Sequence, residues 1–283
     1  MNLVMKGFSP KRTLILAAGL SLVQLMQGSL VGAHLALTFA ALDISVGVML
    51  AVFLGWFASR TKLGMKSLAI MFWTSLFVVQ FFNNEIEAYF FTSLFSSFGI
   101  FIEGLIFPLL FTLVEGMLAA VILGYGLPGV SSTASMKEYF STRSLRSWIE
   151  RIAVASLSYF PIYFFFGLLI SPFVIPYYSS PSLGLRVPPF TVMIPLEVFR
   201  GFMYVLVSLP VVAALVPGGR IRFLVLATML YVPGALIPLL GNPALPLQIV
   251  PFHLVEILAD SIAYGYVLSR VLGQPPSPQT LPS

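Results

Sequence analysis

Three ionisable side chains near the carboxyl end of the chain share one face of an expected helix. The stretch PFHLVEILADSIAYGYVLSRVL, residues 251–272, contains His253, Glu256 and Asp260 among mostly apolar residues. An α-helix turns about 100° per residue, so steps of three and seven place these groups within roughly 60° of one another. An imidazole and two carboxylates on one face can hold a proton, bind a cation or ligate a metal. We call this set the polar stripe.

Other charged residues lie in or beside apolar stretches elsewhere in the chain. Such residues usually face the protein interior and mark a site, because a charge in hydrocarbon costs roughly 3 kcal/mol even on the most lenient scale. We therefore predict that an ion- or substrate-binding site combines the polar stripe with Glu103, Glu197, Arg200, Asp43 and Glu87. A plainer interpretation of Glu197 and Arg200 is an intrahelical ion pair, since they are three residues apart.

The scarcity of metal-binding residue types limits the cofactor chemistry. The chain has two histidines and no cysteine, which excludes disulfides, thiolate nucleophiles and cysteine-ligated metals. A divalent metal at His253 and Glu256 stays a candidate cofactor, with Glu87 or Glu103 needed as a third ligand. The sequence contains no HExxH, no GxSxG and no phosphate-binding loop ending in Gly-Lys-Ser/Thr, so these catalytic and nucleotide-binding classes have no support.

The composition of the chain indicates the elements that must position these residues. Of 283 residues, 58% are hydrophobic and 9% are charged, and the mean hydropathy is +0.98. Too few polar side chains remain to cover a water-soluble globule of this size. We predict an all-α polytopic integral membrane protein with about eight transmembrane helices, at approximately 13–32, 35–58, 66–84, 98–124, 152–172, 192–216, 221–240 and 251–271.

The basic residues predict the orientation of these helices. Thirteen of the fifteen lysines and arginines fall before the first helix, after the eighth, or in the connections that lie on the same side. The positive-inside rule places that side in the cytoplasm, so both termini are expected there, in a plasma membrane. The basic residues are scattered and do not form one face, which argues against nucleic acid as a partner and leaves the lipid bilayer as the expected one.

Weak internal similarity predicts two parallel four-helix repeats. The second and sixth helices open with LDISVGVM at Leu42 and LEVFRGFM at Leu196, and IFIEG and FHLVEI begin the fourth and eighth. This alignment matches Asp43 with Glu197 and Glu103 with Glu256. The predicted organisation is a first half at 1–126, a cytoplasmic connection at 127–150, a second half at 151–272 and a disordered cytoplasmic tail at 273–283.

The connection at 127–150 has a second possible role. Its aromatic and basic residues fit a helix on the membrane surface, with Lys137, Arg143, Arg146 and Arg151 facing anionic headgroups. A cytoplasmic partner docking at 135–150 is the sharper alternative.

Three classes of function are compatible with these residues. The first is a transporter or permease that binds a cation, a proton or a basic solute at an acidic site in the outer half of the bilayer. The second is a membrane-embedded metal-dependent hydrolase or transferase acting on lipid or peptide, with Glu256 as general base. The third is a noncatalytic subunit of a membrane complex. The parallel repeat and the prolines inside expected helices favour the transporter.

Overall fold

The computed structural model describes residues 7–30, 37–127, 129–216, 218–240 and 245–273, and its regular structure there is helical. Seven helices in these ranges are long and apolar enough to cross a membrane. A helix satisfies its own backbone hydrogen bonds, which hydrocarbon requires. The eighth expected segment is α11 (Val250–Val271), a helix of 22 residues that is not among the seven. Its polar stripe lowers its hydropathy. The predicted tail lies outside the described residues, except for Gly273.

Two of the seven membrane-length helices contain a π-helical turn. The first joins α3, η1 and α4, and the second joins α9, η3 and α10. In order, the elements are α1 (Pro10–Leu30), α2 (Leu37–Ser59), α3 (Met65–Leu76), η1 (Phe77–Phe82), α4 (Asn83–Phe91), α5 (Phe98–Gly124), α6 (Ser132–Phe140), α7 (Leu145–Tyr178), the short 3₁₀ helix η2 (Pro181–Leu183), α8 (Phe190–Ala214), α9 (Gly219–Tyr231), η3 (Val232–Leu236), α10 (Ile237–Leu240) and α11.

Serine caps fix the starts of three helices. Ser97, Ser131 and Ser144 accept hydrogen bonds from the third backbone N–H that follows each of them, at the beginnings of α5, α6 and α7. Because Ser144 caps it, α7 begins at Leu145, earlier than the expected 152. The connection expected at 127–150 is therefore α6 followed by the first turns of α7.

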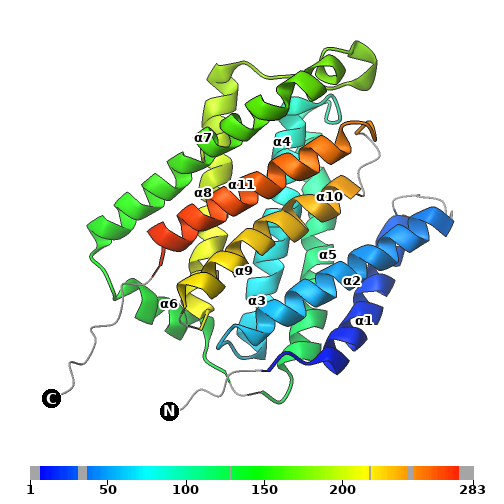
Figure 1. The fold of residues 1–283 in the computed structure, drawn as a ribbon. Coiled ribbons are helices and arrows are strands. Elements are labelled where there is room, and N and C mark those ends of the chain that lie inside the picture. Colours follow the sequence, from blue (N-terminus) through cyan, green and yellow to red (C-terminus); the bar gives the residue numbers. More distant parts are fainter. Residues whose placement is uncertain (1–6, 31–36, 128, 217, 241–244, 274–283) are drawn as a thin grey trace.

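The helices pack in two groups. In the first group α1 packs on α2 and α5, and α3 packs on α5. In the second group α7 packs on α8 and α11, and α9 packs on α11. The groups meet through α2 with α9, α3 with α8, and η1 with η3. Figure 1 shows the long helices running up and down the bundle in turn, with α6 at the end where α7 begins and α11 ends.

The loops after α2 and α8 join the two groups at that same end. The Lys62 amide donates to the Ala214 carbonyl at 3.0 Å, and the Val216 amide donates to the Arg60 carbonyl at 2.9 Å. This short antiparallel bridge satisfies backbone groups that would otherwise end two helices without partners.

The last turn of α11 is held by side chains from α6, the α6–α7 loop, α7 and α9. Burial raises the pKa of Tyr139, so its hydroxyl stays protonated and can donate. The Tyr139 hydroxyl donates to the Leu272 carbonyl at 2.6 Å. The guanidinium groups of three arginines also donate to backbone carbonyls: Arg143 to Gly273 at 2.5 Å, Arg151 to Val271 at 2.6 Å and Arg222 to Ser269 at 3.1 Å. Cations at a helix carboxyl end also interact favourably with its dipole. Arg143 and Arg151 thus bind α11, where the sequence had led us to expect contacts with lipid headgroups. This clamp fixes the axial position of the polar stripe.

Candidate functional site

A buried arginine on α8 binds two glutamates from different parts of the chain. Arg200 Nη1 lies 2.7 Å from Glu197 Oε2 on the same helix, and Nη2 lies 2.6 Å from Glu87 Oε2 on α4. The side chains of Arg200 and Glu197 are 3% and 0% exposed, so solvent screens this network very little. The intrahelical pair expected from the sequence is confirmed. The contact with Glu87 converts it into a link between the two helix groups.

Aromatic side chains of α7 surround this ion network. The Arg200 guanidinium lies 5.7 Å from the ring centroids of both Tyr159 and Tyr163. The Tyr163 hydroxyl donates to Glu87 Oε1 at 3.2 Å. Ring faces attract a cation, and the hydroxyl adds a hydrogen bond to the carboxylate. These contacts fix Arg200 between α7 and α4.

The first two residues of the polar stripe contact each other on α11. His253 Nδ1 lies 2.8 Å from Glu256 Oε2, and both side chains are largely buried. On the other side of the carboxylate is Gly167 of α7, where an added Cβ would stand only 3.1 Å from Glu256 Oε1. Glu256 is also within electrostatic range of Glu87 and Arg200. Glycine at 167 therefore leaves the space that the carboxylate occupies.

Asp260, the third residue of the stripe, is buried one turn further along α11. Its side chain faces a cavity of about 20 Å³ between α7, α8, α9 and α11, and the residue is 4% exposed. Its Oδ1 atom is buried without a hydrogen-bond partner among the described residues. The interior position expected for the stripe is confirmed by the burial of Glu256 and Asp260.

The predicted site residues are only partly brought together. Those that gather between α4, α8 and α11 are Glu87, Glu197, Arg200, His253, Glu256 and Asp260, and we call this set the polar cluster. Glu103 on α5 is exposed, and Asp43 on α2 is half-buried with its carboxylate against Gly28 of α1. Neither takes part in an ion pair among the described side chains. The cluster thus belongs mostly to the second helix group.

Two buried amides were not singled out from the sequence. Gln80 and Asn83 lie in and just after η1, at 4% and 0% exposure. Both amide atoms of Asn83 and Oε1 of Gln80 have no partner among the described residues. Asn83 is one helical turn before Glu87. The available signal was the pair of amides within the apolar run FVVQFFNN, a pattern that indicates a polar interior.

Another buried acid lies in the first helix group. Glu115 of α5 is 1% exposed, and Gln24 of α1 donates to its Oε1 at 2.5 Å. Its Oε2 atom has no partner within the described part of the chain. This pair joins α1 to α5 apart from the polar cluster.

No family model, characterised protein or solved structure matches this chain. The function is therefore inferred from the site alone. Within the ranges that the structure describes, no three or more histidine, aspartate or glutamate side chains are grouped so that they could hold a metal ion. His253 and Glu256 have each other, but the third ligand that we expected from Glu87 or Glu103 is not in place. The part of the chain that the structure describes therefore offers no set of ligands for a divalent metal.

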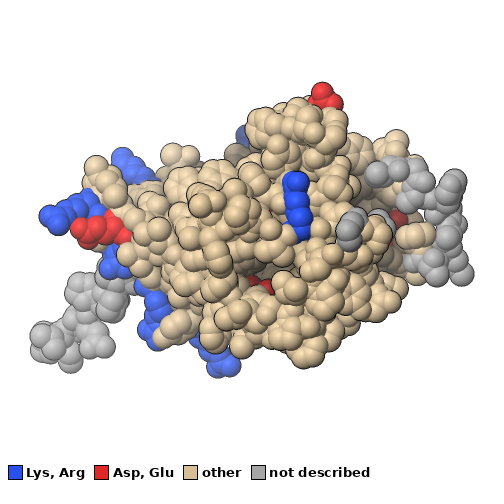
Figure 2. All heavy atoms as spheres, turned by 90° about the horizontal axis from the view of Figure 1, so that it is seen from above, with Lys and Arg blue, Asp and Glu red and all other residues tan. Residues whose placement is uncertain are grey.

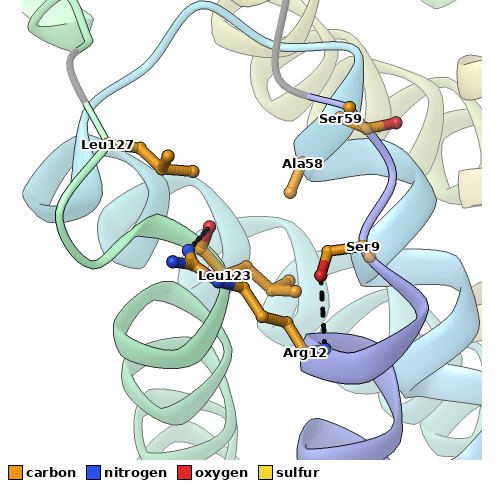
Figure 3. A pocket seen from close by; sticks show the side chains of 8 residues that line it. Ser9, Arg12, Ala58, Ser59, Leu123 and Leu127 are labelled. Atoms are coloured by element: carbon orange, nitrogen blue, oxygen red, sulfur yellow. Dashed lines mark hydrogen bonds between the residues drawn. The ribbon is translucent and has the colours of Figure 1, made fainter.

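A larger cavity lies where α1 begins and α2 and α5 end. It has a volume of about 260 Å³ and is lined by residues of α1, α2 and α5 and the segments beside them, including Arg12, Ser59 and Leu127. Figure 3 shows Arg12 reaching across toward the end of α5, where it donates to the Leu123 and Tyr125 carbonyls, each at 3.2 Å. Arg12 therefore caps a helix, and this cavity contains none of the predicted site residues.

The outer surface separates charged from uncharged regions. Figure 2 shows lysine and arginine side chains gathered toward the left end of the molecule, while most of the face is uncharged. That end corresponds to α6 and the start of α7 in Figure 1, where Lys137 and Arg146 are exposed. Acidic atoms appear only in small areas, one of them recessed near the middle of the face. The uncharged surface is suited to contact with lipid.

Proposed function

We propose that this protein is a membrane transporter that binds a proton, an inorganic cation or a basic solute at the polar cluster. The observation that carries the proposal is the excess of buried and half-buried carboxylates over fixed positive charge. Four carboxylates, those of Glu87, Glu197, Glu256 and Asp260, share one arginine and one histidine. Even with His253 protonated, the fully ionised cluster keeps a net negative charge.

Such an excess favours a positively charged ligand. Moving a carboxylate from water into the protein interior costs roughly several kcal/mol unless a nearby positive charge or a proton compensates its negative charge. Arg200 compensates Glu197 and Glu87, and His253 is placed to compensate Glu256. A cation that enters the cluster removes the remaining penalty, and its departure restores it. A cation-coupled transporter requires such reversible binding of a cation at an internal site.

Two observations support the accompanying proposal of parallel repeats. The contacts of α1 with α2 and of α3 with α5 correspond to those of α7 with α8 and of α9 with α11. The π-helical turns η1 and η3 fall in corresponding spans and contact each other. A two-fold axis between the groups would produce matching contacts of this kind.

The glycines of the repeated sequence motif have the same packing role. A Cβ at Gly47 of α2 would meet the Ser21 backbone of α1 at 2.4 Å, and one at Gly201 of α8 would meet the Ser156 carbonyl of α7 at 2.5 Å. Small residues allow membrane helices to approach this closely. The same constraint at the same motif position favours a common origin of the two halves.

The transport proposal can be tested on protein reconstituted into liposomes. Solid-supported-membrane currents would be recorded after concentration jumps of protons, Na⁺, K⁺ and lysine. We expect a saturable current with at least one of these probes, above that of empty liposomes, and competition between that probe and protons. If folded protein, verified by circular dichroism, produces no current with any of them, the proposal fails.

We further propose that the protein lies in a plasma membrane with α6 and both termini on the cytoplasmic side, because the basic residues gather at that end. The chain has no cysteine, so single cysteines report topology without background. Thr133→Cys in α6 and Ser182→Cys in the loop after α7 are both at exposed positions. An impermeant maleimide added to intact cells should label Ser182→Cys, and Thr133→Cys only after the cells are opened. The reverse pattern would overturn the orientation.

The other functional classes receive less support from the structure. A metal-dependent enzyme lacks its third ligand in the described residues, and a subunit that pairs its acids with a partner would expose the polar stripe to lipid, where Glu256 and Asp260 do not lie. A cytoplasmic partner at 135–150 stays a proposal, for which the exposed Lys137, Glu138 and Arg146 offer a polar surface.

A further inference from the structure

We propose that Asp260 is the proton-binding residue of this transporter and that the cavity beside it holds the water that exchanges the proton. The inference depends on the proposed transport function, but it concerns an equilibrium property of the folded protein. Asp260 is 4% exposed, and its Oδ1 atom has no hydrogen-bond partner among the described residues. A buried carboxyl oxygen without a partner needs a proton or a ligand.

The size of the cavity restricts what that ligand can be. About 20 Å³ accommodates a single water molecule and excludes a hydrated ion or an organic solute. The lining residues besides Asp260 are Tyr159, Tyr204, Leu230, Ile257, Ser261 and Tyr264. Rings and aliphatic chains form most of this surface. A mostly apolar site with room for one water suits a proton carried by the carboxyl group more than a metal ion that needs many oxygen ligands.

The hydrogen of one lining hydroxyl is already directed elsewhere. The Tyr264 hydroxyl lies 3.1 Å from the Ala155 carbonyl and 3.0 Å from the Gly201 carbonyl, so its hydrogen points to the backbone of α7 and α8. The lone pairs of the hydroxyl oxygen stay available as acceptors. A protonated Asp260, or a water next to it, can therefore donate toward Tyr264.

The charged and titratable groups around Asp260 leave it without a fixed counterion. Arg200 is already engaged by Glu197 and Glu87, at 2.7 and 2.6 Å. From α9 the cavity receives only the apolar side chain of Leu230. The titratable groups on the surrounding helices are Glu87 of α4, Tyr159 and Tyr163 of α7, Glu197, Arg200 and Tyr204 of α8, and Glu256, His253 and Tyr264 of α11. Because the nearby carboxylates are negative, they also favour the neutral acid.

The proton-transfer step is a simple exchange with water. A hydronium ion that reaches the cavity gives up one O–H bond, and an O–H bond forms on the Asp260 carboxylate, which leaves neutral water. In the reverse step the carboxylic acid loses its proton to water on the side to which the site has opened. No other reactant is needed. A change in the charge of Asp260 alters the electrostatic balance of the whole polar cluster, which is how the proton would couple to a second ligand.

An isotope-edited infrared experiment can observe this proton directly. The chain has only two aspartates, Asp43 and Asp260. In Asp43→Asn protein grown with aspartate labelled with ¹³C at the side-chain carboxyl, the carbonyl stretch of a protonated aspartic acid therefore reports on Asp260 alone, with its site unaltered. Glu115 and the other glutamates carry no label. Spectra would be recorded over the pH range in which circular dichroism shows folded protein.

We expect a label-sensitive protonated-acid band at low pH that is replaced by the carboxylate band as the pH rises. The double variant Asp43→Asn/Asp260→Asn, which contains no aspartate to label, should lack this transition, whereas the exposed-residue control Glu150→Gln in the Asp43→Asn protein should retain it. Two results would overturn the proposal: no protonated band at any pH, or a band that does not change with pH. Because the spectra require no transport, their failure leaves the transport proposal to be judged by the liposome currents.

Discussion

Replacing Arg200 with methionine should destabilise the protein more than any other single substitution in the polar cluster. Methionine keeps most of the aliphatic volume but removes the positive charge that Glu197 and Glu87 share at 2.7 and 2.6 Å. Breaking a buried ion pair by removing one partner costs about 3–5 kcal/mol. We expect a fall in unfolding free energy of this order, measured by chemical denaturation in detergent micelles or bilayer discs.

Two further variants distinguish the loss of charge from the loss of packing. Arg200→Met combined with Glu197→Gln removes one of the two uncompensated carboxylates, so the double variant should regain part of the lost stability. Arg200→Lys should be intermediate, because one ammonium group replaces two separate nitrogen contacts. A surface control is Arg146→Met, which breaks the exposed pair with Glu150 and should cost less than about 1 kcal/mol.

An Arg200→Met protein as stable as wild type would contradict this account of the cluster. It would mean that Glu87 and Glu197 are neutral in the folded protein and that Arg200 is not needed to compensate them. The excess of carboxylate charge on which the transport proposal depends would then have to be reassessed.

The interior position of the polar stripe was predictable because it depends only on helix geometry and on the cost of charge in hydrocarbon. His253, Glu256 and Asp260 share a face on any regular helix, and the apolar surroundings require that face to point inward. The pairing of Glu197 with Arg200 was predictable for the same local reason. Windows of about 20 mostly apolar residues also located the helices to within several residues.

The contact between Glu87 and Arg200 could not be predicted from the sequence because a π-helical turn precedes Glu87. Residues 77–82 form η1, which inserts extra backbone into the span and rotates everything after it relative to a regular α-helix. The sequence named Glu87 as a candidate site residue without predicting its direct contact with Arg200. In the structure Glu87 reaches Arg200 across 113 positions of the chain, whereas Glu85 takes no part in an ion pair among the described residues.

The motif match aligns Glu103 with Glu256 in the sequence. It does not predict toward which side of its helix each side chain points. Glu103 stands on the exposed side of α5, and Glu256 is 7% exposed on α11 between other helices. A sequence alignment fixes neither the tilt nor the rotation of a helix, which are set by neighbouring helices. The two halves can thus share packing glycines while only the second supplies most of a polar site.

Glu256→Gln should abolish most of the transport while leaving the fold intact. Glutamine has nearly the same shape, so it fits beside Gly167 and keeps a polar contact with His253, but it can neither carry negative charge nor release a proton. A charge-assisted hydrogen bond contributes roughly 1.5–3 kcal/mol, so affinity for a positive ligand should fall by about 10- to 100-fold. The measurement is the concentration dependence of the liposome current, with the melting temperature recorded in parallel.

Comparison with alanine separates charge from packing at this position. Glu256→Ala leaves His253 buried without its partner and opens a void beside Gly167, which should reduce unfolding free energy by about 1–3 kcal/mol. The glutamine variant should melt close to wild type, and Glu150→Gln, at the exposed start of α7, should change neither stability nor current. A glutamine variant with both normal current and normal melting would show that Glu256 is merely tolerated in the bundle. Because Glu256 is the only residue of the cluster that contacts His253 and also lies within range of Glu87 and Arg200 in the described structure, the polar cluster would then no longer be the transport site.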